Sequence, residues 1–412
     1  MNSKRKNKIS ECCDILDNLR VPINDEIRQT MQGNIPYYGA NGIQGYIDKY
    51  IFDEDLILLA EDGGNFEEYH TRPIAYKISG KSWVNNHAHI LRAKPEFNQD
   101  FIFYSLVHKD ITKYLNSGTR SKLNKSELEK IEIDFPATKD EEDKIAKILS
   151  TADAVIEKTQ AVIAKYKAIK QGMLQDLFTR GIDVNTNKLR PRYQDAPELY
   201  KESKLGMIPR EWYVRELESV CDVRDGTHDS PAYHDKGIPF ITSKNLKETG
   251  IDFTDINYIS KENHIQFSQR SKVENGDILF AMIGTVGNPV IVNANFEFSI
   301  KNVALLKFEQ SKDLINTYSL QFLKSNQISE QFGRKSEGSV QSFISLTTIR
   351  SLLFPIPNLN EQNAIAERFL SIDTTLQTEQ TYLQKMQSLK KGLMDDLLCG
   401  KVKVSEPLIV TD

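Results

Sequence analysis

The sequence has few cysteines and no arrangement of them that suits a structural metal. It contains 4 cysteines among 412 residues, and no two follow the Cys-x-x-Cys spacing of a zinc site. They are Cys12, Cys13, Cys221 and Cys399. Disulfide frameworks belong to oxidising compartments and use cysteine more densely. We therefore expect a cytoplasmic protein whose thiols are buried or incidental.

Long apolar runs are also missing. No run reaches the roughly eighteen apolar residues that a membrane-spanning helix needs. The first residues, MNSKRKNKIS, lack the apolar centre of a secretory signal. We therefore expect no membrane association.

The chain has no excess of basic residues. It carries 53 Lys and Arg against 57 Asp and Glu, which gives a formal net charge of -4. Nucleic-acid-binding proteins usually show a basic excess. A DNA-binding chain of this composition would need local basic patches or partners that supply positive charge.

Motifs of common nucleotide-binding and DNA-modifying enzymes are absent. The chain has no Pro-Pro, which the Asn/Asp-Pro-Pro-aromatic element of DNA amino-methyltransferases requires, and no GxxxxGK[ST] loop for ATP. The segment Gly284-Thr285-Val286-Gly287 has no GxGxxG pattern, so we interpret it as a turn after a strand. We predict a non-catalytic chain that binds no cofactor itself.

Two histidines have a spacing that could suit metal ligands. His87 and His89 alternate on a predicted strand, so they share one face and could both bind an ion. The second half of the chain has Val303 and Leu305 at the matching positions, and no third ligand is evident. We predict packed or surface histidines and no metal site.

The chain contains a long internal repeat. Residues 141–180 align without a gap on residues 361–400, at a constant offset of 220 positions. Residues shared by the two copies include Ile145/Ile365, Asp153/Asp373, Lys165/Lys385, Lys170/Lys390, Gly172/Gly392 and Leu177/Leu397. Such a repeat indicates a duplicated architecture.

Each copy has the pattern of one long amphipathic helix. Apolar residues recur at three- and four-residue steps, with a flanking column every seven residues. A helix of this length spans roughly 60 Å, and a seven-residue repeat favours a coiled-coil seam between the copies. The alternative is two ordinary helices, each buried in its own domain. Gly172 and Gly392 indicate close backbone approach, or simple tolerance of glycine.

The rest of the chain divides around these helices. We predict a first globular unit at 1–140, a helix at 141–180, a linker at 181–205, a second unit at 206–358 and a helix at 359–402. The linker is polar, charged and contains two prolines, so we expect little regular structure there. The second unit repeats the first in outline: residues 237–241 match 34–38, 277–281 match 55–59, 300–305 match 84–89, and 338–341 match 118–121.

This order predicts an α+β protein. Two mixed α/β domains are separated by two long antiparallel helices and are related by an approximate two-fold axis. A parallel pairing would require about 60 Å of returning chain, so we favour the antiparallel arrangement.

Binding is the remaining function, and the loops of both units carry suitable side chains. Arg and Lys suit guanine, and Asn and Gln suit adenine. The first unit offers Asn41, Arg72, Asn85, Asn86, Arg120, Lys122 and Lys125, with Tyr37 and Tyr38 able to stack or pack. The second unit offers Thr242, Ser243, Lys244, Asn245, Lys301, Asn302, Gln341 and Ser342. Each alone is an ordinary loop residue, but their recurrence in matching loops favours contact with DNA.

Several segments resemble the specificity (S) subunit of type I restriction-modification systems. They are KGLMDDLLCGKV at 391–402, KQGMLQDL at 170–177, PNLNEQNAIA at 357–366 and GMIPREW at 206–212. The resemblance covers nearly the whole chain. It departs at the start, where no GxIPxxW segment precedes Lys8-Ile9-Ser10, so the first unit is reshaped there.

The resemblance implies a role in a larger complex. Two target-recognition domains would each read half of a split, asymmetric sequence in double-stranded DNA. The long helices would space these domains and dock two methyltransferase (M) subunits, which bind S-adenosylmethionine and methylate adenine. Restriction (R) subunits, which use ATP and Mg²⁺, would join through them. The alternatives are a protein–protein adaptor with a coiled-coil rod that binds no DNA, and an enzyme with an unrecognised site.

Overall fold

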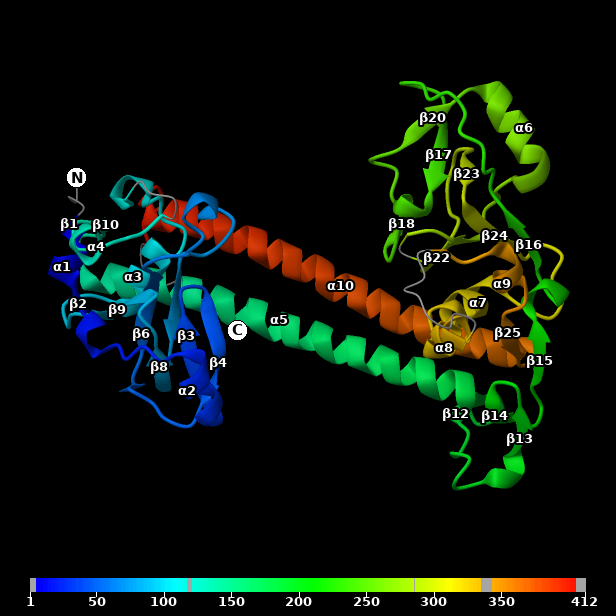
Figure 1. The fold of residues 1–412 in the computed structure, drawn as a ribbon, viewed down its shortest axis with the longest axis horizontal. Helices are drawn as coiled ribbons and strands as arrows, with labels where there is room; N and C mark the ends of the chain where they lie inside the picture. The colour runs from blue at the N-terminus through cyan, green and yellow to red at the C-terminus, as the bar shows by residue number, and fades with distance from the viewer. Residues whose placement is uncertain (1–4, 117–120, 285, 335–342, 405–412) are drawn as a thin grey trace. The chain divides into compact units, whose positions relative to one another are not determined.

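The computed structural model describes residues 5–116, 121–284, 286–334 and 343–404 (Figure 1). Contacts divide the chain into two compact units. Unit 1 comprises Met1–Ala161 and Gln380–Asp412, and unit 2 comprises Val162–Glu379. Each unit contains one domain of mixed helix and sheet together with parts of both long helices.

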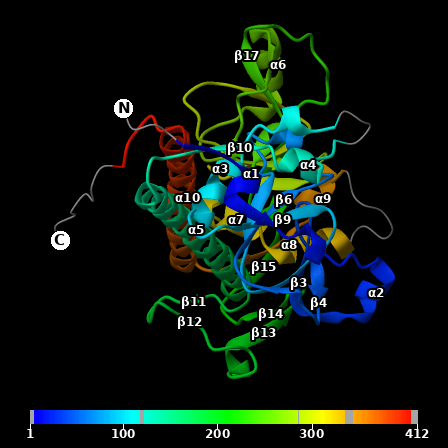
Figure 2. The same cartoon turned by 90° about the vertical axis from the view of Figure 1, so that its left-hand side faces the viewer.

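Unit 1 is built on two four-stranded sheets, ordered β2-β9-β6-β7 and β4-β3-β8-β5, and a separate β1-β10 pair. Figure 2 turns unit 1 toward the viewer and labels β3, β4, β6, β9 and β10. Its strands are β1 (Arg5–Lys8), β2 (Cys13–Ile15), β3 (Gln32–Gly39), β4 (Gly42–Ile47), β5 (Phe52–Asp53), β6 (Leu56–Ala60), β7 (Ala75–Ile78), β8 (Lys81–Val84), β9 (Ala88–Ala93) and β10 (Glu132–Phe135). Its short helices are α1 (Ile9–Cys12), α2 (Asp25–Thr30), α3 (Gln99–Leu106) and α4 (Lys125–Leu128). The β6 sequence LILLA is buried at every position, as its uninterrupted apolar run predicts.

Unit 2 repeats this topology. Its strands are β11 (Ile182–Asp183), β12 (Lys188–Leu189), β13 (Tyr200–Ser203), β14 (Gly206–Pro209), β15 (Tyr213–Glu216), β16 (Asp222–Asp225), β17 (Ile238–Thr242), β18 (Leu246–Lys247), β19 (Gly250–Ile251), β20 (Asn257–Ile259), β21 (Ile278–Ala281), β22 (Gly287–Ile291), β23 (Ser299–Lys301), β24 (Val303–Lys307) and β25 (Leu353–Ile356). Its short helices are α6 (Lys261–Ser271), α7 (Asn316–Leu323), α8 (Asn326–Arg334) and α9 (Leu346–Arg350).

The strand order shows the duplication directly. The sheet β16-β24-β21-β22 matches β2-β9-β6-β7, and the pair β15-β25 matches β1-β10. The parallel pair β17-β23 likewise matches β3-β8. The predicted correspondences at 237–241, 277–281 and 300–305 are therefore confirmed. The fourth, which pairs 338–341 with 118–121, lies almost wholly outside the described residues.

The two predicted long helices are confirmed. They are α5 (Lys139–Thr179), with 41 residues, and α10 (Leu359–Leu398), with 40. In unit 1, Lys390 Nζ lies 2.5 Å from Asp153 Oδ1; in unit 2, Lys170 Nζ lies 2.5 Å from Asp373 Oδ1. These are the same two positions of the repeat with the partners exchanged, so the helices pair antiparallel in both units.

The repeated glycines do not mark close approach within the chain. A Cβ atom added at Gly172 or Gly392 would meet no described atom within 4 Å. Our first interpretation, close backbone approach inside this protein, is therefore wrong for the described residues. Both glycines lie in open space on the long helices.

The predicted irregular linker is instead folded. In unit 2, β11 pairs with β12 and β13 pairs with β14, which places two short hairpins within or across residues 181–205. Arg190 is only 9% exposed, and its Nη2 lies 3.0 Å from Oε2 of the fully buried Glu361. Trp212 Nε1 donates to the same carboxylate at 3.0 Å. A polar segment becomes ordered here because its arginine meets a buried acid that sequence composition does not reveal.

Three of the four cysteines are buried, and Cys399 is exposed. Burial raises the pKa of the Cys221 thiol to about 12, which keeps it protonated at neutral pH. Among the described helices, none combines the length and apolarity needed to cross a lipid bilayer.

Candidate nucleic-acid interface

A cavity of about 760 Å³ in unit 2 collects most of the residues predicted there. Ser243, Lys244, Lys301 and Asn302 all line it, although the first and last are far apart in the sequence. Its other lining residues are Tyr233, Thr242, Leu246, Lys247, Ile283, Gly284 and Asn288. The sequence analysis did not select Tyr233 and Lys247. The only sequence feature that indicated them was their place in turn-rich segments.

Two parallel strands create this cavity. β17 and β23 pair in register from Phe240 and Ser299 to Thr242 and Lys301, so both strands end at the same sheet edge. Loops that leave such an edge bring distant side chains together. Asn302 directly follows β23 with a φ of 52°, a left-handed conformation that asparagine tolerates better than most residues.

The polar groups around the cavity are oriented by mutual contacts. Lys301 Nζ donates to Ser230 Oγ at 2.5 Å. Because a hydroxyl is neutral, this bond does not compensate the ammonium charge. His228 Nδ1 lies 2.6 Å from Asn302 Oδ1, and Ser243 Oγ donates to the Asn302 carbonyl at 3.3 Å. Lys244 Nζ lies 3.1 Å from Asp255, whose side chain is 86% exposed, so this ion pair is weak.

Asn245 has a structural role that the sequence did not predict. It is only 2% exposed, and its Oδ1 accepts from the Thr242 amide at 2.9 Å. Its Nδ2 donates to the carbonyls of Asp252 and Asp255 at 3.1 and 2.9 Å. With the whole amide used inside the fold, Asn245 supports the loop and presents no group to a ligand.

In unit 1 the predicted amides are also engaged internally. Asn85 is 3% exposed, and its Nδ2 donates to Gln44 Oε1 at 3.1 Å. Asn41 is exposed, and its Nδ2 donates to the Gly63 carbonyl at 2.8 Å. Asn86 has an exposed side chain. Tyr37 is buried, so it packs rather than stacks on a ligand.

Tyr38 is half-buried, and burial raises the pKa of its phenol. Its ring centroid lies 6.5 Å from that of Tyr76. Lys125 is exposed at the first position of α4. Arg120, Gln341 and Ser342 lie outside the described residues.

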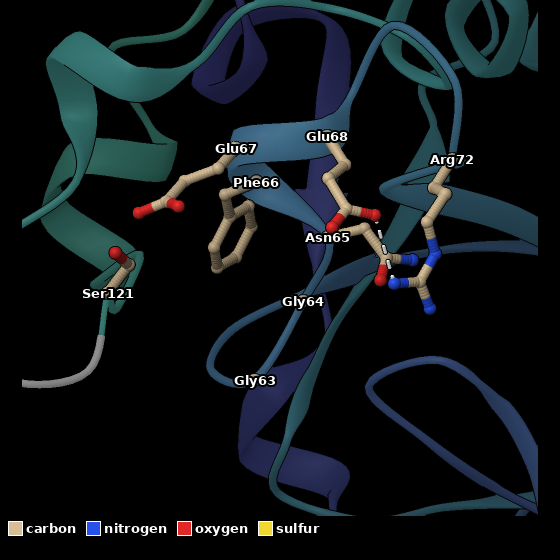
Figure 3. A pocket seen from close by; sticks show the side chains of 8 residues that line it. All are labelled: Gly63, Gly64, Asn65, Phe66, Glu67, Glu68, Arg72 and Ser121. Carbon is tan, nitrogen blue, oxygen red and sulfur yellow. Dashed lines mark hydrogen bonds and ion pairs between the residues drawn. The ribbon is translucent and has the colours of Figure 1, made fainter. Parts of the chain in front are cut away.

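Two of the predicted cations of unit 1, Lys122 and Arg72, are paired with carboxylates. Lys122 Nζ lies 3.0 Å from Glu61 Oε1. Arg72 lines a cavity of about 290 Å³ beside Gly63 and Gly64, and its Nη1 lies 3.1 Å from Glu68 Oε2 (Figure 3). The Lys122 pairing could not be predicted from the sequence, because Glu61 is far from Lys122 along the chain.

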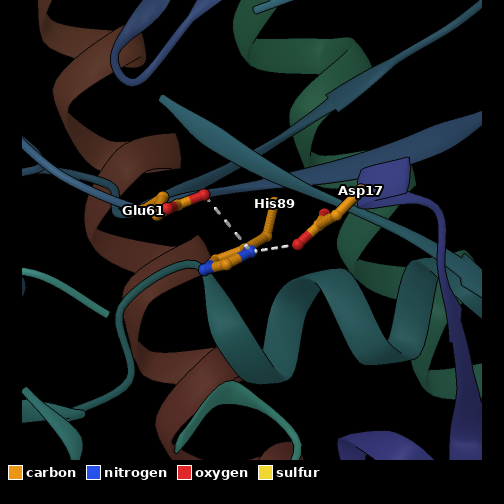
Figure 4. Close-up of side chains that lie close together, drawn as sticks. All are labelled: Asp17, Glu61 and His89. Atoms are coloured by element: carbon orange, nitrogen blue, oxygen red, sulfur yellow. Dashed lines mark hydrogen bonds and ion pairs between the residues drawn. The ribbon is translucent and has the colours of Figure 1, made fainter. Parts of the chain in front are cut away.

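The two histidines considered as metal ligands do not share a site. His87 Nδ1 lies 2.8 Å from Asp62, whereas His89 lies between Asp17 and Glu61 (Figure 4). His89 Nδ1 is 2.6 Å from Asp17 Oδ2, and its Nε2 is 2.8 Å from the Leu123 carbonyl.

The three groups Asp17, Glu61 and His89 lie close enough to bind a metal, but a cation already occupies the space beside them. Arg20 lies 3.5 Å from Asp17 and 2.6 Å from Glu61. Burial alone would raise the pKa of Asp17, but the His89 and Arg20 contacts outweigh it and lower that pKa. We interpret the cluster as an internal ion-pair network.

A family sequence model described as "Type I restriction modification DNA specificity domain" matches residues 3–166 and again residues 209–388. The chain belongs to this family. The two matches contain the two duplicated domains, so the type I specificity fold occurs twice in one chain. Specificity subunits are non-catalytic, which agrees with the missing enzyme motifs.

Individual type I relatives cover nearly the whole chain. A putative type I restriction enzyme specificity subunit of Haemophilus influenzae is 27% identical and covers 93% of this chain and 91% of its own length. A type I specificity subunit of Methanocaldococcus jannaschii is 26% identical, covering 92% and 88%. The crystal structure of the type I S subunit from M. genitalium has the same fold, with a TM-score of 0.63 at 17% identity and 96% coverage of both chains.

Proposed function

We propose that this chain is the DNA-reading subunit of a type I restriction-modification complex, and that its two domains each read one half of a bipartite, asymmetric target. The observation that carries the proposal is the unit 2 cavity, where Lys244, Lys247 and Lys301 adjoin Tyr233 and Asn302. Lysine contacts guanine O6 and N7, and asparagine contacts adenine N6 and N7. The duplicated fold supplies two readers, and their different loops supply two different half-sites.

The acidic balance of the chain bears on its partners. Phosphate contacts provide most of the affinity for DNA, and a net charge of -4 is unfavourable for them. We propose that methyltransferase subunits supply many of these contacts and bind S-adenosylmethionine for adenine methylation. Restriction subunits that use ATP and Mg²⁺ would join through them, and the complex would act in the cytoplasm.

Repeated surface positions on the long helices support the docking of two identical subunits. Two copies of one partner require two equivalent surfaces on this chain. Ile169 and Leu389 occupy the same position of the repeat and are 41% and 50% exposed, so both copies present a large apolar residue to solvent at that position. Gly172 and Gly392, three positions further on, are open to a partner backbone. We propose that each methyltransferase subunit covers one such pair.

The direct test is a domain exchange. Residues 1–140 are replaced by those of a relative with a different target, the complex is expressed, and adenine methylation is mapped across the host genome. We expect one half-site to change and the other to persist. A change in both halves, or in neither, would contradict independent reading. Loss of all methylation upon deletion of the gene, restored by the wild-type chain, is the control.

A second test concerns spacing. The helices α5 and α10 are unbroken over 41 and 40 residues, and we propose that they fix the spacer between the half-sites. Removing one turn from both helices should alter the permitted spacer length in the methylation map. An unchanged spacer in an active variant would argue against this role.

A further inference from the structure

The two domains carry different residues at one matching position. In unit 1 an isolated antiparallel bridge joins Asp62 to Lys122, and in unit 2 the corresponding bridge joins Ile283 to Phe343. Each bridge links the turn after the central strand, β6 or β21, to the segment before α4 or α9. A charged pair in one domain is therefore replaced by an apolar pair in the other.

The apolar pair is held outward by an anchored backbone. Ile283 is 39% exposed and Phe343 is 51% exposed, whereas their neighbours Met282 and Ile344 are each 2% exposed. The Ile344 amide donates to the Met282 carbonyl at 2.8 Å, which fixes the two segments together. Because side chains alternate across extended backbone, burial of these neighbours turns Ile283 and Phe343 away from the core.

The surroundings of the pair determine what can cover it. Ile283 lines the same cavity as Lys244 and Lys301, so a ligand there meets apolar and cationic groups together. Duplex DNA presents both, since phosphates surround the grooves and base edges lie within them. The largest apolar group on a base edge in the major groove is the C5-methyl of thymine.

We propose that the Ile283–Phe343 bridge contacts a thymine methyl group and makes thymine a preferred base in the half-site read by unit 2. This inference rests on the proposed DNA-reading function. The matching Asp62–Lys122 bridge offers no apolar surface, so unit 1 has no such thymine preference from this position.

The test uses the full chain assembled with its methyltransferase subunits and a duplex carrying the target found by methylation mapping. Each thymine of the unit 2 half-site is replaced singly by uracil, which lacks the methyl group but keeps the hydrogen-bonding pattern. Binding is measured by fluorescence anisotropy. At one position we expect wild type to lose about fourfold in affinity, the factor for one buried apolar carbon. In complexes that carry Phe343→Ala or Ile283→Ala, the same uracil substitution should reduce affinity little or not at all.

A matched control comes from the same cavity. Lys301→Ala should weaken binding to both duplexes and keep the wild-type ratio between thymine and uracil. The proposal is overturned if every uracil substitution is neutral for wild type, if the ratio is unchanged in both apolar variants, or if the half-site contains no thymine. It is also overturned if Phe343→Ala abolishes an unstacking signal from 2-aminopurine while uracil has no effect. Failure of the wild-type complex to bind any DNA would instead refute the DNA-reading function itself.

Discussion

The two units share a strand order but use their loop cations differently. In unit 1, Lys122 is paired with Glu61 and Arg72 with Glu68. In unit 2, Lys301 bonds a neutral hydroxyl beside two further lysines in one cavity, and one of these, Lys244, pairs only weakly with the exposed Asp255. Duplication has preserved the sheets, which carry the core, whereas the loops at their edges have diverged.

This difference has an electrostatic consequence. A cation firmly paired with a carboxylate contributes little field at a distance, whereas a cluster of lysines whose charge is only partly compensated attracts a polyanion. We therefore infer that unit 2 supplies more of this chain's own attraction for DNA, and that the described loops of unit 1 rely more on direct base contacts or on partner subunits.

The largest expected contrast between the repeats concerns stability. Glu361 is fully buried and bonds both Arg190 and Trp212, so Glu361→Ala leaves the buried guanidinium with only the largely exposed Glu211 as an acidic partner. We expect a loss of about 3–5 kcal/mol in the free energy of unfolding of unit 2. Glu141 occupies the same position of the repeat but is only half-buried, so Glu141→Ala is the control. Urea denaturation measures both, and equal losses would erase this contrast.

A second contrast concerns DNA affinity. Lys301→Ala should weaken target binding by about 1–3 kcal/mol and relax specificity at one position of the unit 2 half-site. Lys122→Ala should change affinity by less than about 0.5 kcal/mol, because the Lys122 ammonium is already paired with the Glu61 carboxylate. Titrations of the assembled complex at several salt concentrations measure both. A larger effect at Lys122 would reverse the electrostatic comparison.

A smaller contrast lies where each domain contacts the long helices. In unit 1, Tyr104 Oη donates to Asp153 at 2.7 Å, and in unit 2 Gln321 Nε2 donates to Asp373 at 3.2 Å. Tyr104→Phe should cost unit 1 about 1 kcal/mol, the usual net value of one hydrogen bond. Gln321→Leu should cost less, since its bond is longer. Thermal unfolding checks this order, and a greater loss at Gln321 would contradict it.

The parts of the fold that the sequence predicted are those set by local periodicity and by the repeat. The long helices follow from apolar residues at helical spacing, and β6 follows from its apolar run. The prediction of an irregular linker was wrong because the composition shows charge and proline but does not show that Arg190 has a buried acidic partner. Ordered polar segments depend on tertiary contacts, which no window of sequence contains.

The candidate site was predicted unevenly for a similar reason. Residue type alone selected Lys301 and Asn302, which the structure places together, and also Asn85 and Asn245, which are buried with their amides engaged. An asparagine that closes a turn and one that faces a ligand have the same sequence appearance. Only the hydrogen bonds of the fold separate them, as they do for the His89 cluster.

That cluster yields the smallest expected contrast, which depends on pH. The pKa of Asp17 is lowered in the folded chain, despite burial, by His89 and Arg20. A carboxyl with a lowered folded pKa stabilises the protein above its unfolded pKa, near 4, and this contribution is lost as pH falls through the folded value. Asp17→Asn should therefore destabilise unit 1 at neutral pH, and its difference from wild type should shrink below about pH 4. In unit 2 burial raises the pKa of Asp277, so wild type loses stability relative to Asp277→Asn as pH rises from the unfolded pKa, near 4, through the folded value. The Asp277→Asn comparison should therefore change with pH in the direction opposite to the Asp17→Asn comparison. Unfolding curves collected from neutral pH to pH 3 would measure both, and coincident profiles would remove this distinction between the units.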